Sequence, residues 1–108
     1  MNIPESDWRV FKEVRGAALD RFCRRILGEC RTLCDDGTEP AHARYLKLYR
    51  LIHQRDKEIA QAFNDFRRST AITCLTTMWQ LGLVTKTELD RFSPSTVQTV
   101  HFLMGDDE

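Results

Sequence analysis

The sequence lacks several features that would point to a particular class of protein. Its longest uninterrupted apolar run falls far short of the ~20 residues that a transmembrane helix needs. No alternation of apolar and polar residues indicates a β-strand. The first seven residues contain neither a basic nor an apolar stretch, so the pattern of a secretory signal is missing. We therefore expect a cytoplasmic protein without a membrane-spanning segment.

A net charge of either sign is also missing. The 108 residues carry 16 basic and 16 acidic side chains, and 42% of the residues are hydrophobic. This composition is typical of a soluble globular domain and does not demand nucleic acid as a partner. The charges are unevenly spread, because residues 40–68 carry seven basic and three acidic side chains, whereas residues 69–108 carry two and five.

Proline is scarce, and the three prolines at positions 4, 40 and 94 leave long stretches without a helix breaker. In these stretches apolar residues recur at alternating steps of three and four, which predicts long helices over about 7–35 and 40–66. A third helix is predicted over about 68–82, and two short C-terminal helices follow, the first at the capping box Thr85–Glu88. The predicted fold is an all-α helical bundle in a single domain, 1–108, whose two long helices are antiparallel.

Charged residues interrupt the apolar stripes of the two long helices. They are Arg15, Glu29, Arg55 and Asp56. A tight hairpin aligns positions whose numbers sum to about 74, so we expect Trp8 to meet Phe66 and Arg15 to reach Asp56. A buried ion pair here would fix the register of the hairpin, since misalignment would leave a charge unpaired in the core. The same four residues could instead line a polar pocket for a small anionic ligand.

The first long helix also carries a flanking stripe of small and apolar residues. It consists of Gly16, Cys23, Leu27, Cys30 and Cys34. Together with the main stripe it covers roughly half of the helix circumference. We therefore expect more than one neighbour to pack on this helix, either two helices of its own chain or one such helix and a partner subunit. The cysteines follow one another at spacings of seven and four without a C-x-x-C turn, so we interpret them as packing residues and expect no metal and no cofactor.

These patterns predict a small non-catalytic protein that acts by protein–protein interaction or self-association, as an adaptor or regulator. The flanking stripe is the expected contact surface, and a homodimer is the simplest assembly that would cover it. An enzyme ranks third, because no serine or cysteine stands with a histidine and an acid at a spacing suggestive of nucleophilic catalysis.

The alternative from a different class is a nucleic-acid-binding regulator. The exposed face of the second helix carries basic residues, namely Arg44, Lys47, Arg50 and Lys57. Residues 70–92 also resemble a helix-turn-helix in outline. The second helix of this segment would be short and would carry Glu88 and Asp90, which repel phosphates.

Overall fold

The structure is a computed structural model that describes residues 2–105. Its elements are α1 (Glu5–Cys34), α2 (Ala41–Phe63), the 3-10 turn η1 (Arg68–Thr70), α3 (Ala71–Gln80), α4 (Lys86–Leu89) and α5 (Pro94–Leu103). The described residues contain no strand, and the predicted all-α class is confirmed. The molecule is elongated, with principal extents of 52 × 27 × 20 Å.

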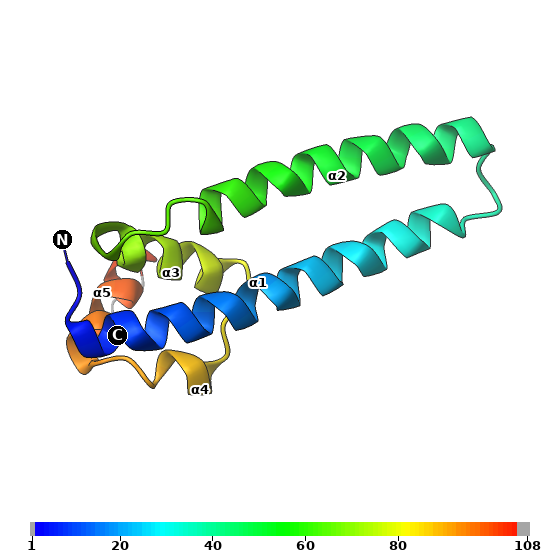
Figure 1. Ribbon diagram of the computed structural model, residues 1–108. Coiled ribbons are helices and arrows are strands. Elements are labelled where there is room, and N and C mark those ends of the chain that lie inside the picture. The colour runs from blue at the N-terminus through cyan, green and yellow to red at the C-terminus, as the bar shows by residue number, and fades with distance from the viewer. Residues whose placement is uncertain (1, 106–108) are drawn as a thin grey trace.

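The two longest helices form an antiparallel hairpin that determines this shape (Figure 1). The 30 residues of α1 extend over about 45 Å at 1.5 Å per residue. At the hairpin turn the carboxylate of Asp36 accepts hydrogen bonds from the backbone N–H and the hydroxyl of Thr38, at 3.1 and 2.5 Å. Arg44 then closes the turn by donating from Nη1 to the carbonyl oxygen of Cys34 at 2.6 Å.

The C-terminal ends of α2 and α3 differ from those predicted. Helix α2 ends at Phe63 instead of about residue 66, and the chain turns before η1, where the hydroxyl of Thr70 donates to the carbonyl oxygen of Asp65 at 2.9 Å. Helix α3 ends at Gln80, because Gly82 adopts φ +72° and donates its N–H to the carbonyl oxygen of Trp79 at 3.0 Å. Glycine adopts this left-handed conformation without the penalty of a Cβ atom.

The short helix α4 begins at the predicted capping box. The Glu88 N–H donates to Oγ1 of Thr85 at 3.1 Å, and the Thr85 N–H donates to the Glu88 carboxylate at 2.8 Å. Arg21 of α1 donates to the same carboxylate at 3.1 Å and also to the carbonyl oxygen of Leu83. The box therefore starts α4 and also attaches it to α1.

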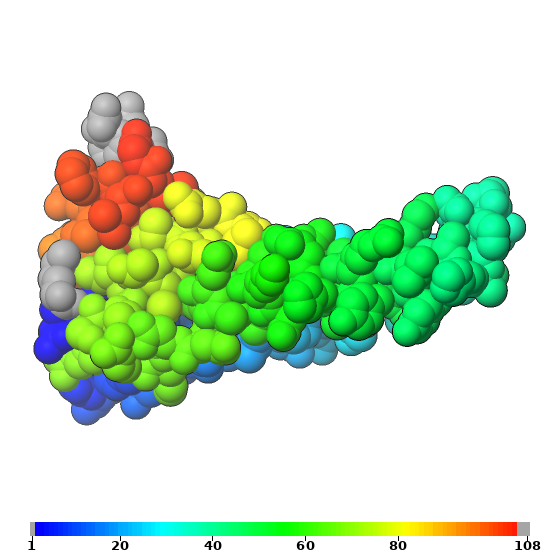
Figure 2. Space-filling model, turned by 90° about the horizontal axis from the view of Figure 1, so that it is seen from above, coloured from blue at the N-terminus to red at the C-terminus, as the bar shows by residue number. Residues whose placement is uncertain are grey.

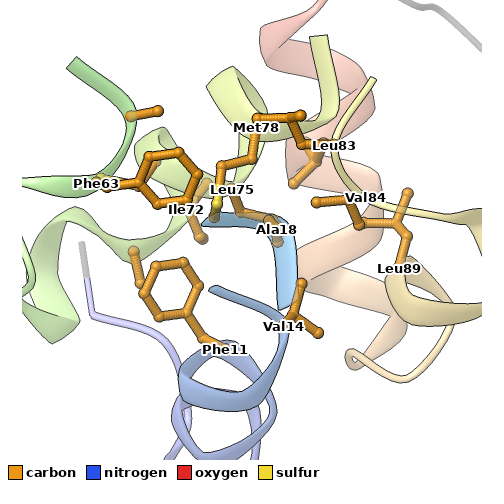
Figure 3. Close-up of a cluster of buried hydrophobic side chains, with 14 of the residues drawn as sticks. Phe11, Val14, Ala18, Phe63, Ile72, Leu75, Met78, Leu83, Val84 and Leu89 are labelled. Carbon is orange, nitrogen blue, oxygen red and sulfur yellow. The ribbon is translucent and has the colours of Figure 1, made fainter. Parts of the chain in front are cut away.

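The hydrophobic core is concentrated at one end of the hairpin, where α3, α4 and α5 pack against it (Figures 1 and 3). Its most completely buried large side chains are Phe11, Val14, Phe63, Leu75, Met78, Leu83, Leu89 and Val100. We call residues 2–26 and 62–105 the body and residues 27–61, which extend beyond it, the arm. Figure 2 shows the arm as a narrow extension of the wider body.

Candidate functional site

The arm lacks a core of its own. None of residues 27–61 is buried to the degree reached by the core of the body, and Ala62 and Phe63 are the buried residues of α2. Two helices in contact bury only the narrow strip between them, and stable domains normally pack a further layer of structure on such a pair. The remaining apolar surface of the arm therefore stays exposed to solvent.

Four of the large exposed hydrophobic side chains lie on the arm. The exposed fraction is 62% for Leu27 and Tyr45, 64% for Tyr49 and 50% for Ile52. Single exposed apolar residues are common on soluble proteins, whereas a cluster of large ones marks an interaction surface. The side of the hairpin on which each residue lies is therefore decisive.

An open groove at the tip of the arm shows which residues share a side. Its volume is about 260 Å³, and it is lined by Cys34 of α1 together with Ala41, Arg44, Tyr45 and Leu48 of α2. Cys34 and Tyr45 thus lie on the same side of the hairpin. The predicted stripe continues from Cys34 along α1, and Tyr49 and Ile52 follow Tyr45 along α2 at helical spacing.

We call this side of the hairpin the open face. It consists of Gly16, Cys23, Leu27, Cys30 and Cys34 on α1 and of Tyr45, Tyr49, Ile52, Asp56 and Ala60 on α2. Cys23 and Cys30 are partly exposed and Cys34 is exposed, and all three are free thiols. A Cβ atom added to Gly16 would meet nothing within 4 Å. No described residue of the chain therefore packs closely on this end of the stripe.

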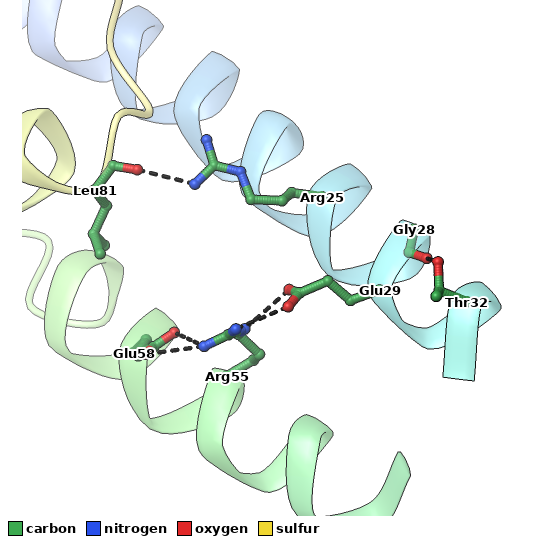
Figure 4. Close-up of polar contacts among 7 residues, drawn as sticks. All are labelled: Arg25, Gly28, Glu29, Thr32, Arg55, Glu58 and Leu81. Atoms are coloured by element: carbon green, nitrogen blue, oxygen red, sulfur yellow. Dashed lines mark hydrogen bonds and ion pairs between the residues drawn. The ribbon is translucent and has the colours of Figure 1, made fainter. Parts of the chain in front are cut away.

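The C-terminal part of the chain covers the opposite side of the hairpin. Arg25 donates to the carbonyl oxygens of Leu81 and Gly82 at 2.9 and 3.3 Å (Figure 4). Its position on the helical wheel is about 160° from that of Leu27. Figure 2 likewise shows the C-terminal helices gathered on one side of the hairpin. The described C-terminal helices therefore leave the open face uncovered.

An ion-pair cluster joins the two helices of the arm (Figure 4). Arg55 donates from Nη2 and Nε to the carboxylate of Glu29 at 2.8 and 3.0 Å, and from Nη1 to Glu58 at 3.0 Å. The hydrogen bonds from Arg55 hold the pKa of Glu29 below its usual value, and those to Glu29 raise the pKa of Arg55. The partly exposed cluster cross-links the two helices of the arm.

The expected pairing of Arg15 with Asp56 is wrong. Arg15 donates from Nη2 to the carbonyl oxygen of Phe63 at 2.6 Å, and its guanidinium lies 4.5 Å from the centre of the Phe66 ring. Asp56 is exposed on the open face. The Arg15–Phe63 and Cys34–Arg44 contacts both join positions whose numbers sum to 78, because the six-residue turn is longer than a tight hairpin requires.

Trp8 and Phe66 do meet as expected, with ring centres 5.2 Å apart. Beside them, Nε of Arg15 is buried without a hydrogen-bond partner among residues 2–105. Arg15 is thus held in the body by the Phe63 carbonyl and the aromatic rings, away from the ion-pair cluster of the arm. The four predicted charges form no common pocket for an anion.

Two of the four basic residues predicted to contact nucleic acid form contacts within the chain, and the other two are exposed. Arg44 caps α1 through the Cys34 carbonyl, and Lys47 pairs with Glu39 at 2.5 Å, so both stabilise the hairpin turn. Arg50 and Lys57 are exposed. Two dispersed cations provide a weak footprint for a polyanion.

The segment 70–92 does not contain the long second helix that a helix-turn-helix inserts into the major groove. Helix α4 has only four residues. Its Lys86 pairs with Asp90 at 2.9 Å, and its Glu88 contacts Arg21 of α1. These observations weaken the nucleic-acid alternative.

A buried carboxylate in the body was not anticipated from the sequence. Asp7 is 2% exposed and accepts hydrogen bonds from the N–H of Ser93 at 2.9 Å and from the hydroxyls of Ser93 and Thr96 at 2.6 Å each. Burial opposes ionisation, but these hydrogen bonds outweigh it and lower the pKa of Asp7. The carboxylate thereby fastens the start of α1 to the start of α5.

The sequence pattern indicates only one of the two partners of this contact. Ser93-Pro94 marks the start of a helix, but the acid that would reach it lies 86 positions away. The first helix was predicted to begin at about residue 7, whereas α1 begins at Glu5 after Pro4. Pairing distant polar residues requires the tertiary arrangement, which the local pattern does not contain.

Among residues 2–105, no group of three or more His, Cys, Asp or Glu side chains is placed to hold a metal ion together. No helix within the same range is both long enough and apolar enough to cross a membrane. Comparisons with protein-family models, with curated proteins and with solved structures find no match for this chain.

Proposed function

We propose that this chain is a non-catalytic protein-interaction module, an adaptor or regulator, that assembles through the open face of its arm. One observation carries the proposal: the arm has no buried residue while it exposes Leu27, Tyr45, Tyr49 and Ile52 on one side. Exposed tyrosines surrounded by apolar residues are typical of interface centres, since each offers a large apolar ring and a polar hydroxyl.

The division of the molecule supports this role. The body contains the complete core and provides a stable anchor, and the arm projects from it with an uncovered face that two helices of a partner would fill. We place the function in the cytoplasm, where the three partly exposed thiols of the open face would remain reduced.

A photo-cross-linking amino acid at position 49, in cells that naturally produce the protein, tests the proposal. Position 54 is the matched control, because Gln54 is equally part of α2 and exposed but points about 140° away on the helical wheel. We expect a protein adduct from position 49 that position 54 does not give, identified by peptide mass spectrometry. Adducts from both positions alike, or from neither, would contradict the proposed function.

A further inference from the structure

We infer that the occupant of the open face is a second copy of this chain, bound antiparallel across a two-fold axis beside Leu27. This inference rests on the proposed function and names its partner. In such a dimer the tip of each arm lies against the body of the other protomer, and the two α1 helices run side by side in opposite directions. The assembly is a four-helix bundle made of two hairpins.

The first argument is the distribution of side-chain size along the open face. On α2 the large residues Tyr45 and Tyr49 lie toward the tip of the arm, whereas the small residue Ala60 lies toward the body. In an antiparallel pair the tyrosines at the tip of each α2 lie toward Ala60 of the partner subunit, which places large residues against a small one, as close packing requires.

The second argument is the register. With a two-fold axis between Ile26 and Leu27, the whole stripe from Gly16 to the hairpin turn lies against the same stripe of the partner subunit. The Arg15–Phe63 and Cys34–Arg44 contacts join positions of α1 and α2 whose numbers sum to 78, and the Glu29–Arg55 contact joins positions that sum to 84. With the sum of 78, the same axis crosses α2 near residue 52.

This register brings complementary groups together. Tyr49 of one protomer lies within about one helical turn of Asp56 of the partner subunit, and Tyr45 lies within about one turn of Ala60 of the partner subunit. A tyrosine hydroxyl donates hydrogen bonds, and Asp56 is an exposed carboxylate that accepts them. The tip of each arm thus meets an acceptor and a small residue.

The third argument concerns charge. The chain carries 16 basic and 16 acidic side chains, so two copies approach one another without net repulsion, and proteins near zero net charge associate readily. Along the stripe from Cys23 to Cys34 the open face of α1 consists of thiols and Leu27. A copy of the same stripe therefore brings no charge against this part of α1.

The register predicts which cysteines of the two protomers face each other. Cys23 of one protomer faces Cys30 of the partner subunit, twice in each dimer, whereas Cys34 faces the region of Leu19 of the partner subunit. The other two-fold arrangement of the same faces sets α1 against α2, which has no cysteine. The cysteine pairing therefore identifies the antiparallel dimer.

Solution mass and mild oxidation of the purified full chain test the inference. At micromolar concentration we expect about twice the chain mass of 12.6 kDa, and after oxidation a covalent dimer joined by Cys23–Cys30 peptides. Cys23→Ser or Cys30→Ser should abolish that covalent dimer, and Cys34→Ser should retain it. Tyr49→Asp should weaken association by about 30-fold or more, the effect of losing a strong interface residue.

The opposite outcomes are equally defined. A monomer at all concentrations, or a dimer whose only cross-link is Cys34–Cys34, would overturn the inference. Tyr49 is 64% exposed, so its substitution leaves the fold of the monomer intact. If the chain is monomeric while position 49 cross-links to another protein in cells, the proposed function stands and the second copy is excluded as the partner.

Discussion

The body and the arm are built from the same two helices, yet they differ in what surrounds those helices. In the body, α3, α4 and α5 add a second layer, and side chains such as Phe11 and Met78 are almost completely buried. In the arm nothing among the described residues is added, and none of residues 27–61 is buried to the same degree. An amphipathic pattern specifies a helix, but a core forms only where a further layer meets the pattern.

The largest contrast between the two regions should come from truncating an aromatic ring in each. We expect Phe11→Ala, in the body, to lower the free energy of unfolding by about 3–5 kcal/mol through lost burial and a cavity. Tyr49→Ala, on the arm, should cost less than about 1 kcal/mol in the monomer, because its ring is already exposed. Urea denaturation measures both values, and equal losses would refute the division.

The Asp7 contact should be the strongest polar contribution to the body. Asp7→Ala leaves the N–H of Ser93 and the hydroxyl of Thr96 without their acceptor. We expect a loss of about 2–3 kcal/mol at pH 7, in the range measured for hydrogen bonds to charged groups. Chemical denaturation of Asp7→Ala beside the exposed control Asp20→Ala measures it. A loss no larger than that of the control would show that the contact is dispensable.

The same carboxylate predicts how stability depends on pH. The pKa of Asp7 in the folded chain lies below its ordinary value of 3.8. Its stabilisation is therefore complete above pH 3.8 and is lost as the pH falls through the folded pKa. The difference in unfolding free energy between wild type and Asp7→Ala should shrink in that window in acid titrations. A difference that grows toward low pH would contradict the assigned direction.

The ion-pair cluster of the arm should contribute less than the Asp7 contact. The side chains of Arg55 and Glu29 are 28% and 36% exposed, so solvent screens their attraction. A double-mutant cycle with Glu29→Gln and Arg55→Gln should give a coupling of about 1 kcal/mol or less. The coupling should fall further with added salt. A salt-independent coupling of several kcal/mol would mean that the arm is covered in solution.

The smallest effects should come from two helical glycines, one in each region. A Cβ atom at Gly16 or at Gly28 would meet nothing within 4 Å. Alanine should therefore stabilise the helix by about 0.5–1 kcal/mol at either site. For Gly16→Ala the gain should appear in global unfolding. For Gly28→Ala it should appear mainly as slower amide exchange in the arm, if the arm opens before the body.

The helices were predictable because local pattern determines them. Spacing of apolar residues located both long helices, and the Thr85–Glu88 box located α4. The hairpin register was not predictable, because it depends on how the chain turns between residues 35 and 40. One helical turn of displacement was enough to separate Arg15 from Asp56 and to give Arg15 a carbonyl and aromatic partner instead.

The open face also shows what the sequence pattern could not determine. The stripe from Gly16 to Cys34 is visible in the sequence. The apolar residues of 40–66 also form a stripe, and that spacing predicts a buried position for its members. Tyr45 and Ile52 lie on that stripe, yet both are at least half exposed. Periodicity identifies a face, and only the three-dimensional structure shows whether anything covers it.

The continuity of α1 has one further consequence. A single helix without an internal proline passes from Glu5 in the body to Cys34 at the tip, so the two regions share one rigid axis. A molecule that binds the tip thereby fixes the orientation of the body. A displacement of the tip relative to the body would therefore require α1 itself to bend.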